Sequence, residues 1–526
     1  MHTTSAEGHK AGPLRRWLLI IAAAALVLAA ILLSHRLKPG EAPEWNPLVM
    51  GYTVTMLIPA AALIFSAVAL FLTSLSRSRE AMARRLKRLV AFCASAVLCV
   101  VALDLVLSFF PKLQKPFVEA EALWPVGEYS VPDSELGFRT KPNLRVNFRF
   151  QPSRFGDILT TNQISRPEPS GEKDIDAEIC TDADGFNSDG VPSAYDMLAV
   201  GDSYTCHTNV PRDKYWPSLV AKEMTASLYN MGVPGYCPPQ ELIALRKYGM
   251  PKKPRVALWG FFQGNDLTES AQFDDWRKSG TDWGTFTLRR MHLDRPFPYN
   301  RPVIRLAMFL AWKSGLAASA LPPLPDYPEP HKLRIGGAER PIVFNRWGFR
   351  ILCCSREQLQ RDLQRKQDPG IQPKLGWLET TESLLEAKKA CDAAGVRLIV
   401  VYLPATLAVF GDDAIDKFDK EKIFRFAKLQ LNELLKKEDG SEITPDEFIA
   451  MLKKNHNAIE EEMKDFCSKN GIEMVDTVPA LQASLHAGEW PYYSYDTHLN
   501  VRGNEVVADT VCKYLKSNPQ APPASP

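Results

Sequence analysis

Four short groups of polar residues contain the side chains that acyl-transfer chemistry requires. They are Gly201-Asp-Ser203, Asn230-Met-Gly-Val-Pro-Gly235, Gly264-Asn-Asp266 and Asp496-Thr-His498-Leu-Asn500. A serine hydroxyl beside an imidazole that a carboxylate orients forms a nucleophile with its general base. Because a serine in a strand-to-helix turn is also a common helix cap, the assignment depends on whether the four groups converge in space.

The groups follow apolar runs that are typical of buried strands, or lie in the loop before the last helix. The runs alternate with amphipathic segments, which predicts an α/β fold with a parallel, doubly wound sheet of flavodoxin-like order. In a parallel sheet all strands end at one edge, so residues distant in sequence can meet there. The predicted strands are 197–200, 227–233, 255–262, 396–402 and 472–475.

The four blocks, in this order, resemble the SGNH hydrolases, also called the GDSL esterase and lipase family. The resemblance covers residues 196–516, with two insertions at 267–372 and 413–470. It implies that Ser203 is the nucleophile; no cofactor is predicted. It also implies that His498 takes the serine proton.

The same resemblance implies an oxyanion hole built from three donors. These are the backbone N–H of Ser203, the backbone N–H of Gly235 and the side-chain amide of Asn265. Fixed donors of this kind stabilise a tetrahedral oxyanion by about 3 kcal/mol each.

The last block departs from the family's usual pattern. The family has an aspartate three residues before the histidine, but that position is Tyr495 here, and Asp496 stands two residues before His498. The Asp-x-His spacing is similar to that of membrane-associated relatives that acetylate exopolysaccharides. We therefore expect Asp496 to orient His498. A competing histidine, His207, has no neighbouring acid in its segment and is interpreted as a loop residue.

The remaining polar and sulfur-containing residues near these blocks have other expected roles. Asp202 and Asp266 are interpreted as structural carboxylates that accept hydrogen bonds from turn amides. Cys206 and Cys237 follow two strands that should be neighbours, so a disulfide beside the nucleophile is a hypothesis for an oxidising compartment. The nine histidines show no metal-ligand spacing, so no metal site is predicted.

Three uncharged or nearly uncharged apolar stretches in the first 110 residues predict transmembrane helices. They are 17–34, 48–75 and 89–110, and each approaches or exceeds the roughly 20 residues that cross a bilayer. Buried core helices are the weaker interpretation, because three such runs occur so close together. Asp104, near the end of the third, is interpreted as interfacial, with a functional intramembrane carboxylate as the alternative.

The loop charges predict how this anchor is oriented. The linker 76–88 carries six basic residues against one Glu80, which places it and the N-terminus in the cytoplasm. Everything after Pro111 is then expected on the periplasmic side of a bacterial cytoplasmic membrane.

The outer part of the chain divides into a lead-in and a larger domain. Residues 111–195 are predicted to form a β-rich lead-in packed on the hydrolase-like domain, and residues 517–526 a disordered tail. The first insertion, 267–372, is expected either to act as a lid or substrate-recognition element or only to pack on the domain.

Three functions remain open at this stage. The first is a membrane-anchored serine esterase acting on an acyl ester of the cell envelope. The second is an O-acyltransferase that modifies an envelope polysaccharide, with a multispan membrane partner supplying acyl groups. The third is a non-catalytic glycan-binding module. The net charge of +2, from 63 basic and 61 acidic residues, argues against nucleic acid as the main partner.

Overall fold

The computed structural model divides the chain into two compact units. Unit 1 comprises 1–125, 159–166 and 287–323, and unit 2 comprises 126–158, 167–286 and 324–526. The structure describes residues 12–33, 48–49, 52–76, 78–110, 113, 129–150, 152, 170–188, 194–206, 209–284, 286–287, 301–313, 331–342, 354–421, 423–424, 427, 435, 437 and 440–519. The predicted tail mostly lies outside them, as does His207.

Unit 1 contains three long apolar helices. They are α1 (Gly12–Leu32), α2 (Val54–Ser74) and α3 (Arg79–Phe109), and α1 packs against α2. On α3, Phe92, Leu98 and Phe109 are 62%, 68% and 76% exposed. Side chains of this kind are stable on a surface only when an apolar medium or a partner covers them.

Two of the three predicted spans have the length and composition to cross a membrane. These are Gly12–Ile31 and Arg79–Phe109, whereas the apolar helix in the second region, Pro59–Ser74, is shorter. The prediction of three spans is therefore not confirmed. Its second stretch begins with two short paired strands, β1 (Leu48–Val49) and β2 (Tyr52–Thr53), before α2 starts at Val54.

The basic linker of unit 1 is also shorter than the sequence predicts. Ser78 caps α3 by accepting a hydrogen bond from the Ala81 N–H, so the helix begins at Arg79 and includes most of the basic residues. At the other end of α3, the buried Asp104 pairs with Arg301 and accepts the Val303 N–H at 3.2 Å. Both partners are at the start of helix α10 (Pro302–Lys313).

Unit 2 is built on the predicted five-stranded parallel sheet. Its order is β13-β12-β9-β7-β8, and all four pairings are parallel. In chain order this is 2-1-3-4-5 read from β8, the flavodoxin-like arrangement, so the predicted fold class is confirmed. The strands are β7 (Met197–Gly201), β8 (Leu228–Asn230), β9 (Val256–Phe262), β12 (Arg397–Leu403) and β13 (Glu473–Asp476).

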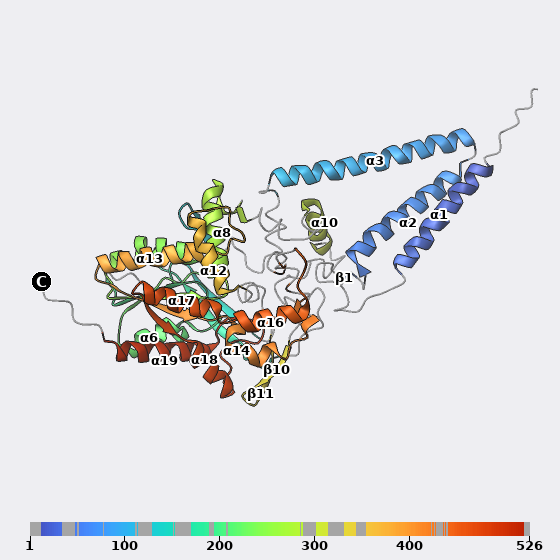
Figure 1. Cartoon of the computed structure of the whole chain (residues 1–526). Helices are drawn as coiled ribbons and strands as arrows, with labels where there is room; N and C mark the ends of the chain where they lie inside the picture. Colours follow the sequence, from blue (N-terminus) through green and yellow to red (C-terminus); the bar gives the residue numbers. More distant parts are fainter. Residues whose placement is uncertain are drawn as a thin grey trace, which may run out of the picture. The chain divides into compact units, whose positions relative to one another are not determined.

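Alternate side chains of the central strands form two hydrophobic cores on opposite faces. Leu258 of β9 and Ile399 of β12 belong to one core, while Trp259 and Val400 belong to the other. Figure 1 shows α6 and α19 on one side of the sheet and α13 on the other. Helices α6 (Trp216–Glu223), α18 (Val478–His486) and α19 (Val501–Ser517) cover the first core, and α7 (Pro238–Ala244), α13 (Trp377–Ala393) and α17 (Ala458–Lys469) cover the second.

The described strands of the lead-in form two antiparallel pairs within unit 2. They are β3 (Ser130–Asp133) with β4 (Gly137–Thr140), and β5 (Arg145–Phe150) with β6 (Ile175–Cys180). Leu136 and Phe186 belong to the same core cluster as Trp259, which agrees with the predicted packing of this segment on the sheet.

The two predicted insertions contain regular elements. The first begins with a helix that the sequence interpretation missed, α8 (Asp266–Ser279), which directly follows β9. It continues with α10, the hairpin of β10 (His331–Ile335) and β11 (Ala338–Ile342), and α12 (Arg356–Leu363). The second region contains α14 (Thr406–Ile415), α16 (Pro445–Asn455) and α17.

Candidate active site

Ser203 lies on a tight turn at the carboxyl end of strand β7. Asp202 anchors this turn, because its carbonyl accepts the N–H groups of Thr205 and Cys206 at 3.1 Å. The strand leads into the turn through Gly201, where a Cβ would come within 2.1 Å of the Thr205 Oγ1. Only glycine fits at such a close approach, so the Gly-Asp-Ser motif follows directly from the packing of the turn.

The structure brings Ser203, His498 and Asp496 into a continuous hydrogen-bonded row. The Nε2 of His498 lies 2.8 Å from the Ser203 Oγ, and its Nδ1 lies 2.5 Å from the Asp496 Oδ1. Asp496 also accepts the backbone N–H of His498 at 3.2 Å. An Asp-x-His spacing therefore suffices for this contact, because the carboxylate folds back onto both the ring and the main chain of the histidine.

The surroundings of His498 favour its role as a proton acceptor. The side chain of Asp496 is 6% exposed and that of His498 is 21% exposed. Burial alone lowers the pKa of His498, but the charge and hydrogen bond of Asp496, with the charge of Asp202, raise it above its ordinary value. A more basic imidazole is a better acceptor for the serine proton.

An aromatic side chain that the sequence interpretation missed holds the histidine loop in place. The ring of Tyr204 stacks on Phe262 with centroids 3.5 Å apart, and its hydroxyl donates to the Thr497 carbonyl at 2.5 Å. Thr406 donates to the same carbonyl at 3.1 Å. The residue after the nucleophile therefore ties it to the loop that carries His498, almost 300 positions along the chain.

The two backbone N–H groups expected in the oxyanion hole belong to Ser203 and Gly235. Within the part of the chain that the structure describes, the N–H groups of Ser203 and Gly235 have no recorded hydrogen-bond acceptor. Gly235 has φ +81°, a conformation that glycine adopts without strain. A Cβ there would meet only Phe138 at 3.6 Å, so backbone conformation and not crowding accounts for this glycine.

The third expected donor, Asn265, is held between carboxylates. Its Nδ2 donates to Glu269 at 2.8 Å, and its side chain also helps to lower the pKa of Asp202. Its buried Oδ1 has no hydrogen-bond partner. A side-chain amide carries two N–H groups, and both face carboxylates here, so Asn265 would bind an oxyanion by giving up its contact with Asp202 or with Glu269.

Fully buried carboxyl groups lie beneath the nucleophile turn. Burial raises the pKa of Asp202 to about 6 and raises those of Glu241 and Asp266 well above their ordinary values. Asp202 accepts the Tyr204 N–H at 2.8 Å, and Asp266 accepts the Phe262 N–H at 2.8 Å, as predicted for structural carboxylates. Burial therefore disfavours the ionised forms of Glu241 and Asp266.

The hypothesis of a disulfide between Cys206 and Cys237 is wrong for this structure, because both are free thiols. Each has its own partner: Asn187 donates to the Cys206 sulfur at 2.9 Å, and the Cys237 thiol donates to Gln240 at 3.2 Å. The two strands are neighbours as expected, but the side chains are engaged separately. Among the described residues, no group of three or more His, Cys, Asp or Glu could hold a metal ion.

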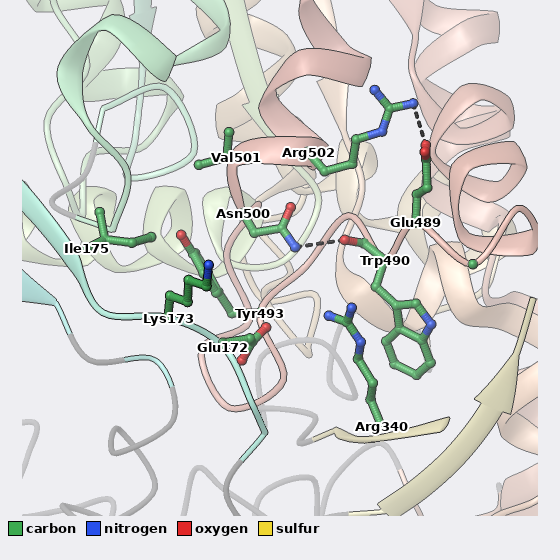
Figure 2. A pocket seen from close by; sticks show the side chains of 11 residues that line it. Glu172, Lys173, Ile175, Arg340, Glu489, Trp490, Tyr493, Asn500, Val501 and Arg502 are labelled. Carbon is green, nitrogen blue, oxygen red and sulfur yellow. Dashed lines mark hydrogen bonds and ion pairs between the residues drawn. The ribbon is translucent and has the colours of Figure 1, made fainter. Parts of the chain in front are cut away.

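A cavity of about 490 Å³ borders the loop between helices α18 and α19, which carries Asp496 and His498 and is called the histidine loop here (Figure 2). The loop contributes Tyr493 and Asn500 to its wall, and the lead-in contributes Glu172. Tyr493 is fixed at both ends, since its hydroxyl donates to the Asn209 carbonyl at 2.6 Å and its N–H donates to the His498 carbonyl at 3.2 Å. The remaining lining residues are Lys173, Ile175, Arg340, Gly488, Glu489, Trp490, Val501 and Arg502.

No protein-family model and no curated protein sequence matches the chain. The solved structures that are similar to it include a protein of Desulfitobacterium hafniense, described as a lipolytic protein of the G-D-S-L family. It is 8% identical, with a TM-score of 0.27, and the match covers 60% of this chain and 97% of that one.

Two further neighbours are a phospholipase A1 of Streptomyces albidoflavus and a mutant of an acetyl-xylooligosaccharide esterase of Geobacillus Stearmophilus. The first is 10% identical, with a TM-score of 0.30 and coverage of 62% and 99%. The second is 10% identical, with a TM-score of 0.24 and coverage of 63% and 97%. Of the three descriptions, that of the Desulfitobacterium hafniense protein names the family that the sequence motifs resemble. Because these identities and TM-scores are low, the function is inferred from the side-chain geometry of the site.

Proposed function

We propose that this chain is an SGNH-type serine hydrolase that cleaves an acyl ester of the cell envelope. The observation that carries the proposal is the unbroken row from Ser203 through His498 to Asp496, with contacts of 2.8 and 2.5 Å. Nucleophile, base and orienting carboxylate within hydrogen-bond reach of each other form the arrangement that acyl transfer needs.

The proposed reaction has two halves. The Ser203 Oγ attacks the acyl carbonyl while its proton moves to the His498 Nε2, and Asp496 stabilises the imidazolium that forms. The negative oxygen faces the N–H groups of Ser203 and Gly235, with Asn265 as the third donor. Collapse of the tetrahedral intermediate breaks the ester C–O bond, and His498 protonates the departing alcohol. Water then repeats the sequence on the acyl-enzyme and releases the acid.

An O-acyltransferase is the alternative, since it differs only in what accepts the acyl group. If a sugar hydroxyl replaces water in the second half, the same residues transfer the acyl group to a glycan. The exposed apolar side chains of α3 and the Asp-x-His spacing favour this alternative. A multispan membrane partner would then deliver acyl groups.

We further propose that α1 and α3 anchor the chain in a bacterial cytoplasmic membrane, with α2 as a third span. Unit 2 would then lie on the periplasmic side. The support is the length and apolar composition of α1 and α3, with the basic residues at the start of α3. Protease protection of unit 2 in intact cells, and its loss after the outer membrane is opened, would test this placement.

The two catalytic outcomes can be separated with the purified full-length protein. Release of p-nitrophenol from p-nitrophenyl acetate in water is expected for the parent and not for Ser203→Ala. If added oligosaccharide accelerates release and becomes acetylated, the protein is a transferase. If acetate is the only acyl product at every oligosaccharide concentration, it is a hydrolase. A folded parent with no turnover and no acyl-enzyme would contradict both outcomes.

A further inference from the structure

A carboxylate of the lead-in contacts the loop that carries Asp496 and His498. Glu172 precedes strand β6, and its Oε1 and Oε2 accept the backbone N–H of Ser494 at 3.1 and 3.3 Å. Ser494 stands two residues before Asp496. We propose that Glu172 is a positioning residue that fixes Asp496, and through it His498, in the geometry required for proton transfer. This inference rests on the proposed function.

The contact is more than a surface hydrogen bond. Ser494 is 1% exposed, so its N–H cannot turn to water and must be satisfied inside the protein. Burial raises the pKa of Glu172, while hydrogen bonds from Ser170 and Ser494 and the charge of Arg340 lower it. Figure 2 shows Glu172 beside Tyr493, with Arg340 directed into the same part of the cavity. Burial of the Glu172 carboxylate is unfavourable, and the carboxylate accepts a hydrogen bond from the buried backbone N–H of Ser494.

Glu172 binds the histidine loop at a point between two of its other attachments. Tyr204 and Thr406 bind the Thr497 carbonyl, after Asp496, and the Tyr493 hydroxyl binds the Asn209 carbonyl. Between these attachments, the Ser494 N–H has Glu172 as its acceptor. A displacement of 1 Å at a catalytic group can reduce the rate about 100-fold. A loosened segment just before Asp496 would act directly on the 2.5 Å contact with His498.

The test compares three variants of the full-length protein. Glu172→Ala removes the acceptor, and Glu172→Gln keeps one oxygen that can accept the Ser494 N–H. Glu178→Gln is the matched control, because Glu178 lies on β6 and forms a partly exposed ion pair with Arg145 at 3.3 Å. Hydrolysis of p-nitrophenyl acetate measures kcat and KM, and thermal unfolding measures the folded fraction.

We expect Glu172→Ala to lower kcat about 10- to 100-fold while KM stays within twofold. Glu172→Gln should recover most of the loss, and Glu178→Gln should behave as the parent. The proposal is overturned if Glu172→Ala retains at least half of the parent kcat. It is also overturned if its activity falls only in proportion to the folded fraction. If Glu172→Ala does not fold, Glu172→Asp replaces it, because the shorter aspartate side chain cannot reach Ser494 equally. A folded Glu172→Asp with parental kcat would then overturn the proposal.

A second readout does not depend on turnover. Asp496 raises the pKa of His498, and Asp202 and Tyr204 also interact with this ring and are unchanged in the Glu172 variants. A loosened Asp496 should therefore lower the imidazole pKa in Glu172→Ala and not in Glu178→Gln, measured by NMR titration of the histidine ring. An unchanged pKa would contradict the positioning role. If the parent shows no Ser203-dependent hydrolysis, the proposed function fails, and the ring titration alone decides the role of Glu172.

Discussion

Replacing Asp496 with asparagine should abolish most of the activity, because the carboxylate sets the tautomer of His498. The Oδ1 of Asp496 accepts both the Nδ1–H at 2.5 Å and the backbone N–H of His498 at 3.2 Å. Asparagine has no charge to stabilise the imidazolium, and because one oxygen serves both N–H groups, the tautomer changes when the amide turns its NH₂ group toward Nδ1. The ring would then carry its proton on Nε2 and would donate to Ser203 instead of accepting from it.

The expected loss for Asp496→Asn is about 10⁴ in kcat, which corresponds to about 5 kcal/mol of transition-state stabilisation. The variant should also shift the pH profile. Activity requires neutral His498, so kcat/KM falls as the pH drops through the pKa of this ring. Because Asp496 raises that pKa, its neutral replacement should move the acid limb of kcat/KM to lower pH.

The assay is the hydrolysis of p-nitrophenyl acetate by full-length protein from about pH 5 to about pH 9. Asp509→Asn is the matched control, because Asp509 is an exposed carboxylate on helix α19, outside the histidine loop. A kcat for Asp496→Asn within tenfold of the parent would refute the assignment of Asp496. It would mean that another group orients His498.

Three other perturbations have defined outcomes. Asn265→Ala should lower kcat about 10²- to 10³-fold with a smaller change in KM, as steady-state kinetics would show, because it removes an oxyanion donor; an unchanged kcat would place Asn265 in a structural role only. Asp202 has its pKa raised by burial from 3.8 to about 6, so its ionisation is disfavoured in the folded state. The parent should therefore lose stability relative to Asp202→Asn as the pH rises from about 4 to about 6, in chemical denaturation at each pH; a difference that is constant with pH would contradict this. Cys206 and Cys237 are buried free thiols, so an alkylating reagent should modify both only after unfolding and without reductant; protection that persists in denaturant would restore the disulfide.

The sequence predicts the sheet and its catalytic edge well, for a local reason. Each strand is a continuous apolar run followed by small or polar residues, as in Met197–Gly201 and Val256–Phe262, and both faces of these strands are buried. The order of a parallel sheet then constrains which turns meet. Asp496 and His498 could be placed at the same edge because they stand directly before the closing helix.

The features that the sequence did not predict depend on contacts between distant segments. The bond from Tyr204 to Thr497 spans 293 positions, and the bond from Glu172 to Ser494 spans 322. No local pattern reports such partners. Helix α8 was missed because its sequence is polar and has little amphipathic periodicity, although it directly follows β9. The separate engagement of Cys206 and Cys237 depends on side-chain direction, which strand order alone does not determine.

The clustering of buried carboxyl groups near Ser203 also could not be predicted from sequence patterns. Glu241 is on helix α7 and Asp266 is on α8, and burial, followed by the charge of Asp202, raises the pKa of both. Each is an ordinary polar residue within its own segment. Only the packing of the two helices against the turn after β7 makes them a group whose ionisation is suppressed.

The central claim is that Ser203 is a nucleophile activated by His498. The most direct measurement is covalent modification of the full-length protein by a fluorophosphonate probe, with the modified peptide identified by mass spectrometry. The account predicts one label on Ser203, no label in Ser203→Ala, and strongly slowed labelling in His498→Ala. A folded parent that stays unlabelled, or that is labelled equally in Ser203→Ala, would contradict it.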